Sequence, residues 1–224
     1  MKIYMTGLVE PKMLETKPHF RFMDTFDFSQ FEGDYIKDFQ KTLEKTKVVH
    51  FKGLPDMSIE ELKTFYKNLT LEVGTFVRRN EDYKTGNLMR EKDEWVDIRC
   101  IESLKTETFR HSDTLQPLHT DRAYYSDFYF NISFFFCLEQ AKLGGATIFI
   151  DGSFLVDIMQ KYEPNLLKDI EKHIVIVDKG TQRSRKDKII KYENNQPLLC
   201  WNYYRVSQEN TDEVKQMCEK FQNF

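Results

Sequence analysis

A histidine and an aspartate two residues apart, His119 and Asp121, carry the clearest chemical signal in this sequence. In an extended chain, residues i and i+2 point to the same side, so the imidazole and the carboxylate can converge on one point. Such a pair supplies two of the three ligands of the facial triad that holds non-haem Fe(II) and leaves other positions on the metal open. On spacing alone, a salt bridge between the two side chains is the simpler interpretation.

The composition is that of an ordinary globular domain. The chain has 224 residues, of which 40% are hydrophobic and 31% charged, so it is long enough for one domain with a sizeable core. The net charge of -3 predicts no nucleic-acid partner, and the basic segment from Lys179 to Lys191 is expected to be a solvated loop or edge strand. No apolar run approaches membrane-spanning length, and the N-terminal residues show no secretion signal.

Cysteine usage indicates the compartment. The chain has four cysteines, widely spaced and without a CxxC pair: Cys100, Cys137, Cys200 and Cys218. This pattern predicts reduced, mostly buried thiols and no zinc site. We therefore expect a cytoplasmic protein.

The elements that must position His119 and Asp121 are predicted from apolar spacing and turn signals. Helices are expected at 34–45, 58–69, 153–161, 164–170 and 209–221. Strands are expected at 48–51, 95–99, 128–138, 146–150, 173–177, 189–190 and 198–204. The long polar connection at about residues 76–114 is typical of either a functional lid or a partly disordered segment. This order predicts a mostly β protein, a sandwich or open barrel with flanking helices.

The context of the pair resembles one enzyme superfamily. The matching residues are His119-Thr120-Asp121, Phe134-Phe135-Phe136-Cys137, and Gly144-Gly145-Ala146-Thr147-Ile148-Phe149-Ile150-Asp151-Gly152. This stretch resembles the Fe(II)- and 2-oxoglutarate-dependent dioxygenases of the taurine dioxygenase and clavaminate synthase-like superfamily. The γ-butyrobetaine hydroxylase branch has a similar Gly-Gly, strand, Asp-Gly sequence. With the strand and turn from Val48 to Pro55, the resemblance covers nearly the whole chain.

The resemblance implies a fold and a reaction. The fold would be a double-stranded β-helix, or jelly-roll, in a single domain of residues 1–224. It would comprise an N-terminal helix and strand region (about 1–75), the lid-like connection (about 76–114) and the jelly-roll core (about 115–224). The reaction would use Fe(II), 2-oxoglutarate and O₂ to hydroxylate or desaturate an unactivated C–H bond of a small polar metabolite.

The same resemblance implies roles for individual residues. His119 and Asp121 would be metal ligands, and the Thr147 hydroxyl would contact 2-oxoglutarate. An ordinary β-branched strand residue is an equal interpretation of Thr147. Arg122, adjacent to Asp121, is the first candidate for binding a substrate carboxylate.

One ligand and one arginine are not found where the resemblance implies them. Relatives carry a distal histidine and a 2-oxoglutarate-binding arginine on strands after the helix that is expected here to end at Phe221, so we expect those C-terminal strands to be missing from this chain. His111 and His173 do not match that position, and the third ligand is not identified. The alternative hypothesis is therefore a truncated or catalytically impaired homologue that binds a metal or ligand or serves as a scaffold. In a further alternative, a residue outside the family's pattern or a second chain completes the site, the latter as a homo-oligomer.

Overall fold

The computed structural model describes residues 21–31, 33–74, 98–106, 109–121, 123–124, 132–179 and 184–224. The chain divides into two units. Unit 1 comprises Met1–Val77 and Phe134–Thr147, and unit 2 comprises Arg78–Ser133 and Ile148–Phe224. The predicted single domain with its three regions stays a prediction.

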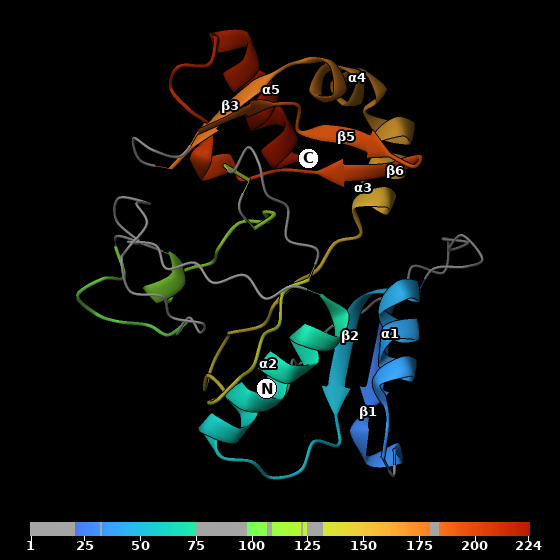
Figure 1. Cartoon of the computed structure of the whole chain (residues 1–224). Helices are drawn as coiled ribbons and strands as arrows, with labels where there is room; N and C mark the ends of the chain where they lie inside the picture. The colour runs from blue at the N-terminus through green and yellow to red at the C-terminus, as the bar shows by residue number, and fades with distance from the viewer. Residues whose placement is uncertain are drawn as a thin grey trace. The chain divides into compact units, whose positions relative to one another are not determined.

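Unit 1 is built around a parallel two-stranded ribbon with helices beside it (Figure 1). Strand β1 (Arg21–Asp27) pairs with strand β2 (Thr46–Lys52), so that Phe26 lies opposite Phe51. The other elements are the 3₁₀ helix η1 (Phe28–Gln30) and the helices α1 (Ile36–Lys45) and α2 (Ile59–Val73). Ser58 begins α2 with a capping box, in which its hydroxyl accepts from the Glu61 amide while the Glu61 carboxylate accepts from the Ser58 amide.

The core of unit 1 is aromatic. Phe26 packs edge to face against Phe39 of α1, with ring centroids 5.4 Å apart. Phe51 of β2 stacks on Tyr66 of α2 at 6.1 Å, and Tyr66 in turn contacts Phe134 at 5.7 Å. These contacts join the ribbon to both helices and to the segment around residue 134. Burial raises the pKa of the Tyr66 hydroxyl to about 12.

The described residues of unit 2 form three α-helices and two short antiparallel ribbons. Its elements in order are η2 (Phe109–His111), α3 (Gly152–Tyr162), α4 (Pro164–Lys172), β3 (Val175–Asp178), β4 (Ser184–Asp187), β5 (Ile190–Glu193), β6 (Gln196–Leu199), η3 (Tyr203–Arg205) and α5 (Asp212–Asn223). Strand β3 pairs with β4, and β5 pairs with β6. The β5–β6 turn places Asn194 and Asn195 at φ of 50° and 62°, the left-handed region that tight hairpin turns require.

The core of unit 2 is mainly aliphatic. Helices α3, α4 and α5 contribute buried residues, and the ribbons add others. The fully buried side chains include Met159, Ile170, Val175, Ile189 and Cys218. Trp201, which follows β6, packs its ring edge to face on Phe221 of α5 at 4.8 Å. No described helix has the length and apolar composition needed to cross a bilayer.

The predicted helices are confirmed, with boundaries that differ by one to a few residues. Four predicted strands correspond to β2, β3, β5 and β6, but the strand predicted at 198–204 ends at Leu199. Two strand predictions are wrong in the described residues, because 132–138 and 146–150 have no strand assignment. A strand requires hydrogen bonds to a neighbouring strand, and neither segment pairs with one in the described part of the chain. The strand predicted at 95–99 lies partly outside the described residues, and its last two positions are not in a strand.

Candidate metal site

The imidazole of His119 is oriented by its own backbone neighbourhood. Its Nδ1 lies 2.9 Å from the carbonyl oxygen of Pro117. Because a carbonyl can only accept, Nδ1 carries the proton and donates it, and in the neutral ring Nε2 keeps its lone pair. The Gln116 amide nitrogen donates to Nε2 at 3.1 Å. Fixing one ring nitrogen by a backbone carbonyl is the arrangement that prepares the other to bind a metal.

The carboxylate of Asp121 faces the same ring nitrogen. Asp121 Oδ1 lies 3.6 Å from His119 Nε2, and the two side chains are 55% and 26% exposed, so an ion can reach them. Ligands at about 2 Å from one ion and at right angles to each other would stand roughly 3 Å apart, about 0.6 Å closer than this pair. An imidazole nitrogen with a carboxylate oxygen is a donor set that fits Fe(II).

The interaction with Asp121 raises the pKa of His119, burial lowers it, and the Pro117 carbonyl raises it further. A proton and a metal ion therefore compete for Nε2, with the carboxylate attracting both. The geometry alone is equally that of a salt bridge. The metal role of the pair stays a prediction at this point.

Thr120, between the two, is bonded to a segment far along the chain. Its amide donates to the Trp201 carbonyl at 2.7 Å, and its hydroxyl accepts from the Trp201 amide at 2.8 Å. No local sequence pattern predicts this contact, because Trp201 lies 81 residues from Thr120, within the stretch 198–204 that was predicted to be one strand.

The other predicted site residues are not brought together with this pair by the described structure. Thr147 is exposed and belongs to unit 1, whereas His119 and Asp121 belong to unit 2. Gly144 and Gly145 precede it with φ of 75° and 73°, a left-handed turn that glycine adopts without strain. Arg122 lies outside the described residues. The roles of Thr147 and Arg122 stay predictions.

No third metal ligand is identified. Among the described residues, no group of three or more His, Cys, Asp or Glu side chains is arranged to hold a metal ion. His111 is buried, and its Nδ1 donates to the Arg99 carbonyl at 3.2 Å. His173 follows α4, where its Nδ1 donates to the Asp169 carbonyl at 2.9 Å. Both rings therefore have partners of their own: His111 bonds to Arg99, and His173 Nε2 also lies 3.7 Å from Glu213 Oε1 of α5.

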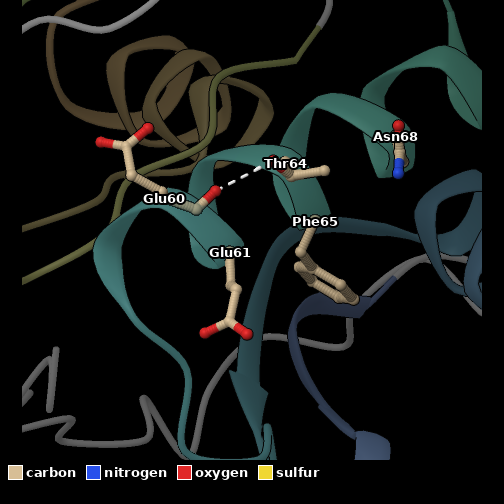
Figure 2. A pocket seen from close by; sticks show the side chains of 5 residues that line it. All are labelled: Glu60, Glu61, Thr64, Phe65 and Asn68. Atoms are coloured by element: carbon tan, nitrogen blue, oxygen red, sulfur yellow. Dashed lines mark hydrogen bonds between the residues drawn. The ribbon is translucent and has the colours of Figure 1, made fainter.

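A surface hollow lies along α2 in unit 1, as Figure 2 shows. Its described lining comprises Glu60, Glu61, Thr64, Phe65 and Asn68. Two of these side chains already form hydrogen bonds within α2. The Thr64 hydroxyl donates to the Glu60 backbone carbonyl, and the Glu61 carboxylate is part of the capping box. The hollow contains none of the predicted site residues.

Comparison with known proteins identifies the family. The profile of the taurine catabolism dioxygenase TauD, TfdA family matches residues 14–220. No curated protein and no solved structure gave a significant match. Members of the matched family are Fe(II)- and 2-oxoglutarate-dependent and are expected to have a jelly-roll fold, whereas the described residues form three two-stranded ribbons and no closed barrel. Because the match spans most of the sequence, the chain belongs to the taurine catabolism dioxygenase TauD, TfdA family.

Proposed function

We propose that this chain is a non-haem iron oxygenase that uses 2-oxoglutarate and O₂ to hydroxylate or desaturate an unactivated C–H bond of a small polar metabolite. Family membership supports the general Fe(II)- and 2-oxoglutarate-dependent chemistry. The observation that carries the proposal is the pair of His119 Nε2 and Asp121 Oδ1, 3.6 Å apart, with the ring oriented by Pro117.

In this proposal His119 and Asp121 hold the metal. The Pro117 carbonyl keeps the proton on Nδ1, so that Nε2 presents its lone pair to the ion. Asp121 supplies a negative charge, which partly offsets the positive charge of the bound ion and makes the carboxylate a stronger ligand than water. Iron and 2-oxoglutarate, when bound, supply the oxygen activation that no side chain can perform.

Two further residues complete the proposal. The Thr147 hydroxyl donates a hydrogen bond to a carboxylate of 2-oxoglutarate, and the Arg122 guanidinium binds a carboxylate on the substrate. The Gly144–Gly152 sequence favours the γ-butyrobetaine hydroxylase branch of the family. The free thiols at Cys100, Cys137, Cys200 and Cys218 favour a cytoplasmic location.

Anaerobic titration with Fe(II) and 2-oxoglutarate tests the metal site directly. The wild-type chain is expected to develop the weak visible charge-transfer band of the iron chelate, and His119→Ala and Asp121→Ala are expected to lose it. His173→Ala is the matched control, because that ring has a hydrogen-bonding role at the end of α4 and is expected to leave the band unchanged. A band that survives both His119→Ala and Asp121→Ala would overturn the proposal.

Turnover separates the enzyme from the alternative, a homologue that binds metal or ligand without catalysis. An active oxygenase is expected to release succinate from 2-oxoglutarate in the presence of O₂, with loss of that release in His119→Ala. Appearance of the charge-transfer band without any succinate would assign the chain to the binding or scaffold class.

A further inference from the structure

We propose that Thr120 and Trp201 form a positioning pair that sets the geometry of the metal-binding side chains. This inference rests on the proposed function of His119 and Asp121. Three hydrogen bonds join the pair. The Thr120 amide donates to the Trp201 carbonyl at 2.7 Å, the Trp201 amide donates to the Thr120 hydroxyl oxygen at 2.8 Å, and that hydroxyl donates to the Trp201 carbonyl at 3.3 Å.

The hydroxyl replaces a backbone acceptor. In an ordinary strand pair the Trp201 amide would donate to a backbone carbonyl, whereas here it donates to the side chain of Thr120. Trp201 is 6% exposed, so its amide has little access to water if that acceptor is removed. The Thr120 amide bond to the Trp201 carbonyl is independent of the side chain, but the Trp201 amide depends on the hydroxyl oxygen at position 120 as its acceptor.

The orientation of Thr120 determines that of its neighbours. Thr120 lies between His119 and Asp121, so the bonds that hold its amide and hydroxyl to Trp201 also hold the backbone from which both side chains project. In this arrangement Asp121 Oδ1 and His119 Nε2 lie 3.6 Å apart. Rotation of this segment would move both donor atoms together.

Trp201 is itself firmly anchored. Its indole Nε1 donates to Gln222 Oε1 at 3.2 Å, and its ring packs edge to face on Phe221 with centroids 4.8 Å apart. Both partners belong to α5. The preceding residue, Cys200, donates its amide proton to the Ile189 carbonyl at 2.8 Å. Thr120 is therefore fixed to the main core of unit 2 and not to a mobile loop.

The test compares three threonine variants. Thr120→Val removes the hydroxyl at constant shape, and Thr120→Ser keeps it. Thr211→Val removes another hydroxyl of unit 2, the N-cap of α5 that accepts from the Val214 amide. Binding of Mn(II), a redox-stable probe for the iron site, is measured by calorimetry with 2-oxoglutarate present, and thermal unfolding of the metal-free chain is measured in parallel.

The positioning role predicts a specific pattern. Thr120→Val is expected to weaken Mn(II) binding by about 10- to 100-fold, the usual effect of losing a residue that orients a ligand. Thr120→Ser is expected to bind as the wild type does. Thr211→Val is expected to unfold at lower temperature and still bind Mn(II) normally. A purely structural role predicts instead that loss of affinity follows loss of thermal stability in all three.

Two further variants keep the outcome decisive. If Thr120→Val does not fold, Trp201→Phe, which loses the bond to Gln222 and part of the ring packing on Phe221, is expected to weaken Mn(II) binding several-fold, and normal binding would overturn the inference. His119→Ala is measured in the same series. Loss of Mn(II) binding in His119→Ala with normal binding in Thr120→Val contradicts the positioning role alone. Mn(II) binding that does not depend on His119 contradicts the proposed function and this inference together.

Discussion

A single buried charge, the guanidinium of Arg185 in β4, shows how much one residue can determine in unit 2. Arg185 is 3% exposed, and its Nη2 lies 3.2 Å from Asp187 Oδ2 and donates to the Lys188 carbonyl at 3.2 Å. Its Nε has no hydrogen-bond partner among the described residues. Asp187 also pairs with Lys191. A buried cation of this kind is tolerated because its carboxylate partner is in place.

Removal of that carboxylate is therefore expected to be costly. Asp187→Asn is predicted to lower the free energy of unfolding by about 3 kcal/mol, because it leaves the guanidinium buried without a counter-charge. The double variant Arg185→Met with Asp187→Leu, in which neither charge remains, is predicted to recover most of this loss. Urea unfolding of the three chains checks the prediction. Equal stability of Asp187→Asn and wild type would contradict it.

The same pair gives a pH dependence. Burial alone raises the pKa of Asp187, but hydrogen bonds from Lys191 and the Lys188 amide, with the charge of Arg185, hold it below its ordinary value of 3.8. A carboxylate with a lowered pKa stabilises the folded state above its ordinary pKa and loses that effect as the pH falls toward the folded value. Wild type is thus expected to lose stability below pH 3.8 more steeply than Asp187→Asn.

At this scale the sequence predicted a candidate metal pair, His119 and Asp121, but not the contacts around it. The spacing of His119 and Asp121 is a local property, and an i, i+2 relation can be found without any structure. Thr120 and Trp201 are 81 residues apart, and no local pattern relates them. Arg185 likewise appeared to be one of several solvated basic residues, and only the fold shows that it is buried.

Among the elements, helices were predictable and several strands were not. A helix forms its hydrogen bonds within itself, so the apolar spacing was a sufficient signal, although the last helix was predicted to begin at 209 and its N-cap is Thr211. Residues 132–138 and 146–150 have the apolar composition of strands, yet Phe135 and Ile148 are 52% and 70% exposed. Strand formation depends on a partner elsewhere in the chain, which composition alone does not specify.

The turn after β2 provides a test of element geometry in unit 1. Gly53 has φ of 70°, and a Cβ at this position would lie 2.6 Å from the Ser29 amide nitrogen and 2.2 Å from Asp27 Oδ1. Gly53→Ala is predicted to destabilise unit 1 by about 3 kcal/mol, from the left-handed backbone together with the clash against η1. Thermal unfolding followed by aromatic circular dichroism measures it.

Gly33→Ala is the matched control for that prediction. Gly33 also has positive φ, 133°, but a Cβ there would have no atom within 4 Å. Its substitution is expected to cost only about 1 kcal/mol, the backbone contribution alone. If the two alanine variants were equally stable, the close approach of η1 to Gly53 would not contribute to the loss of stability in Gly53→Ala.

On the scale of the whole molecule, the two units have different cores, and both buried thiols among the four cysteines lie in unit 2. Cys200 and Cys218 are buried in unit 2, where burial raises the pKa of Cys218 to about 12 and also raises that of Cys200. Cys100 is exposed, and Cys137 is half-buried with its thiol donating to the Glu139 carbonyl. The expectation of mostly buried thiols thus holds for two of the four.

These differences predict distinct rates of thiol labelling. With an aromatic disulfide reagent at neutral pH, Cys100 is expected to react at once, because it is exposed. Cys200 and Cys218 are expected to react only as unit 2 unfolds, since a buried thiol with a raised pKa is rarely a thiolate. Cys100→Ser should remove the fastest phase and leave the slowest unchanged. Labelling of Cys218 at the rate of Cys100 would contradict the buried position of the Cys218 side chain.

The bonding of Thr120 to Trp201 also has a consequence for the timing of local motion. The amide hydrogens of both residues are held in one small cluster of bonds, although they lie far apart in sequence. A single opening event exposes both to solvent, so their deuterium exchange is synchronised. In Thr120→Val the Trp201 amide is expected to exchange faster, because it loses its acceptor. The Thr120 amide is expected to exchange as before, because it keeps the Trp201 carbonyl. The exchange rates of the two amides therefore report separately on the backbone bond and the side-chain bond that Thr120 makes to Trp201.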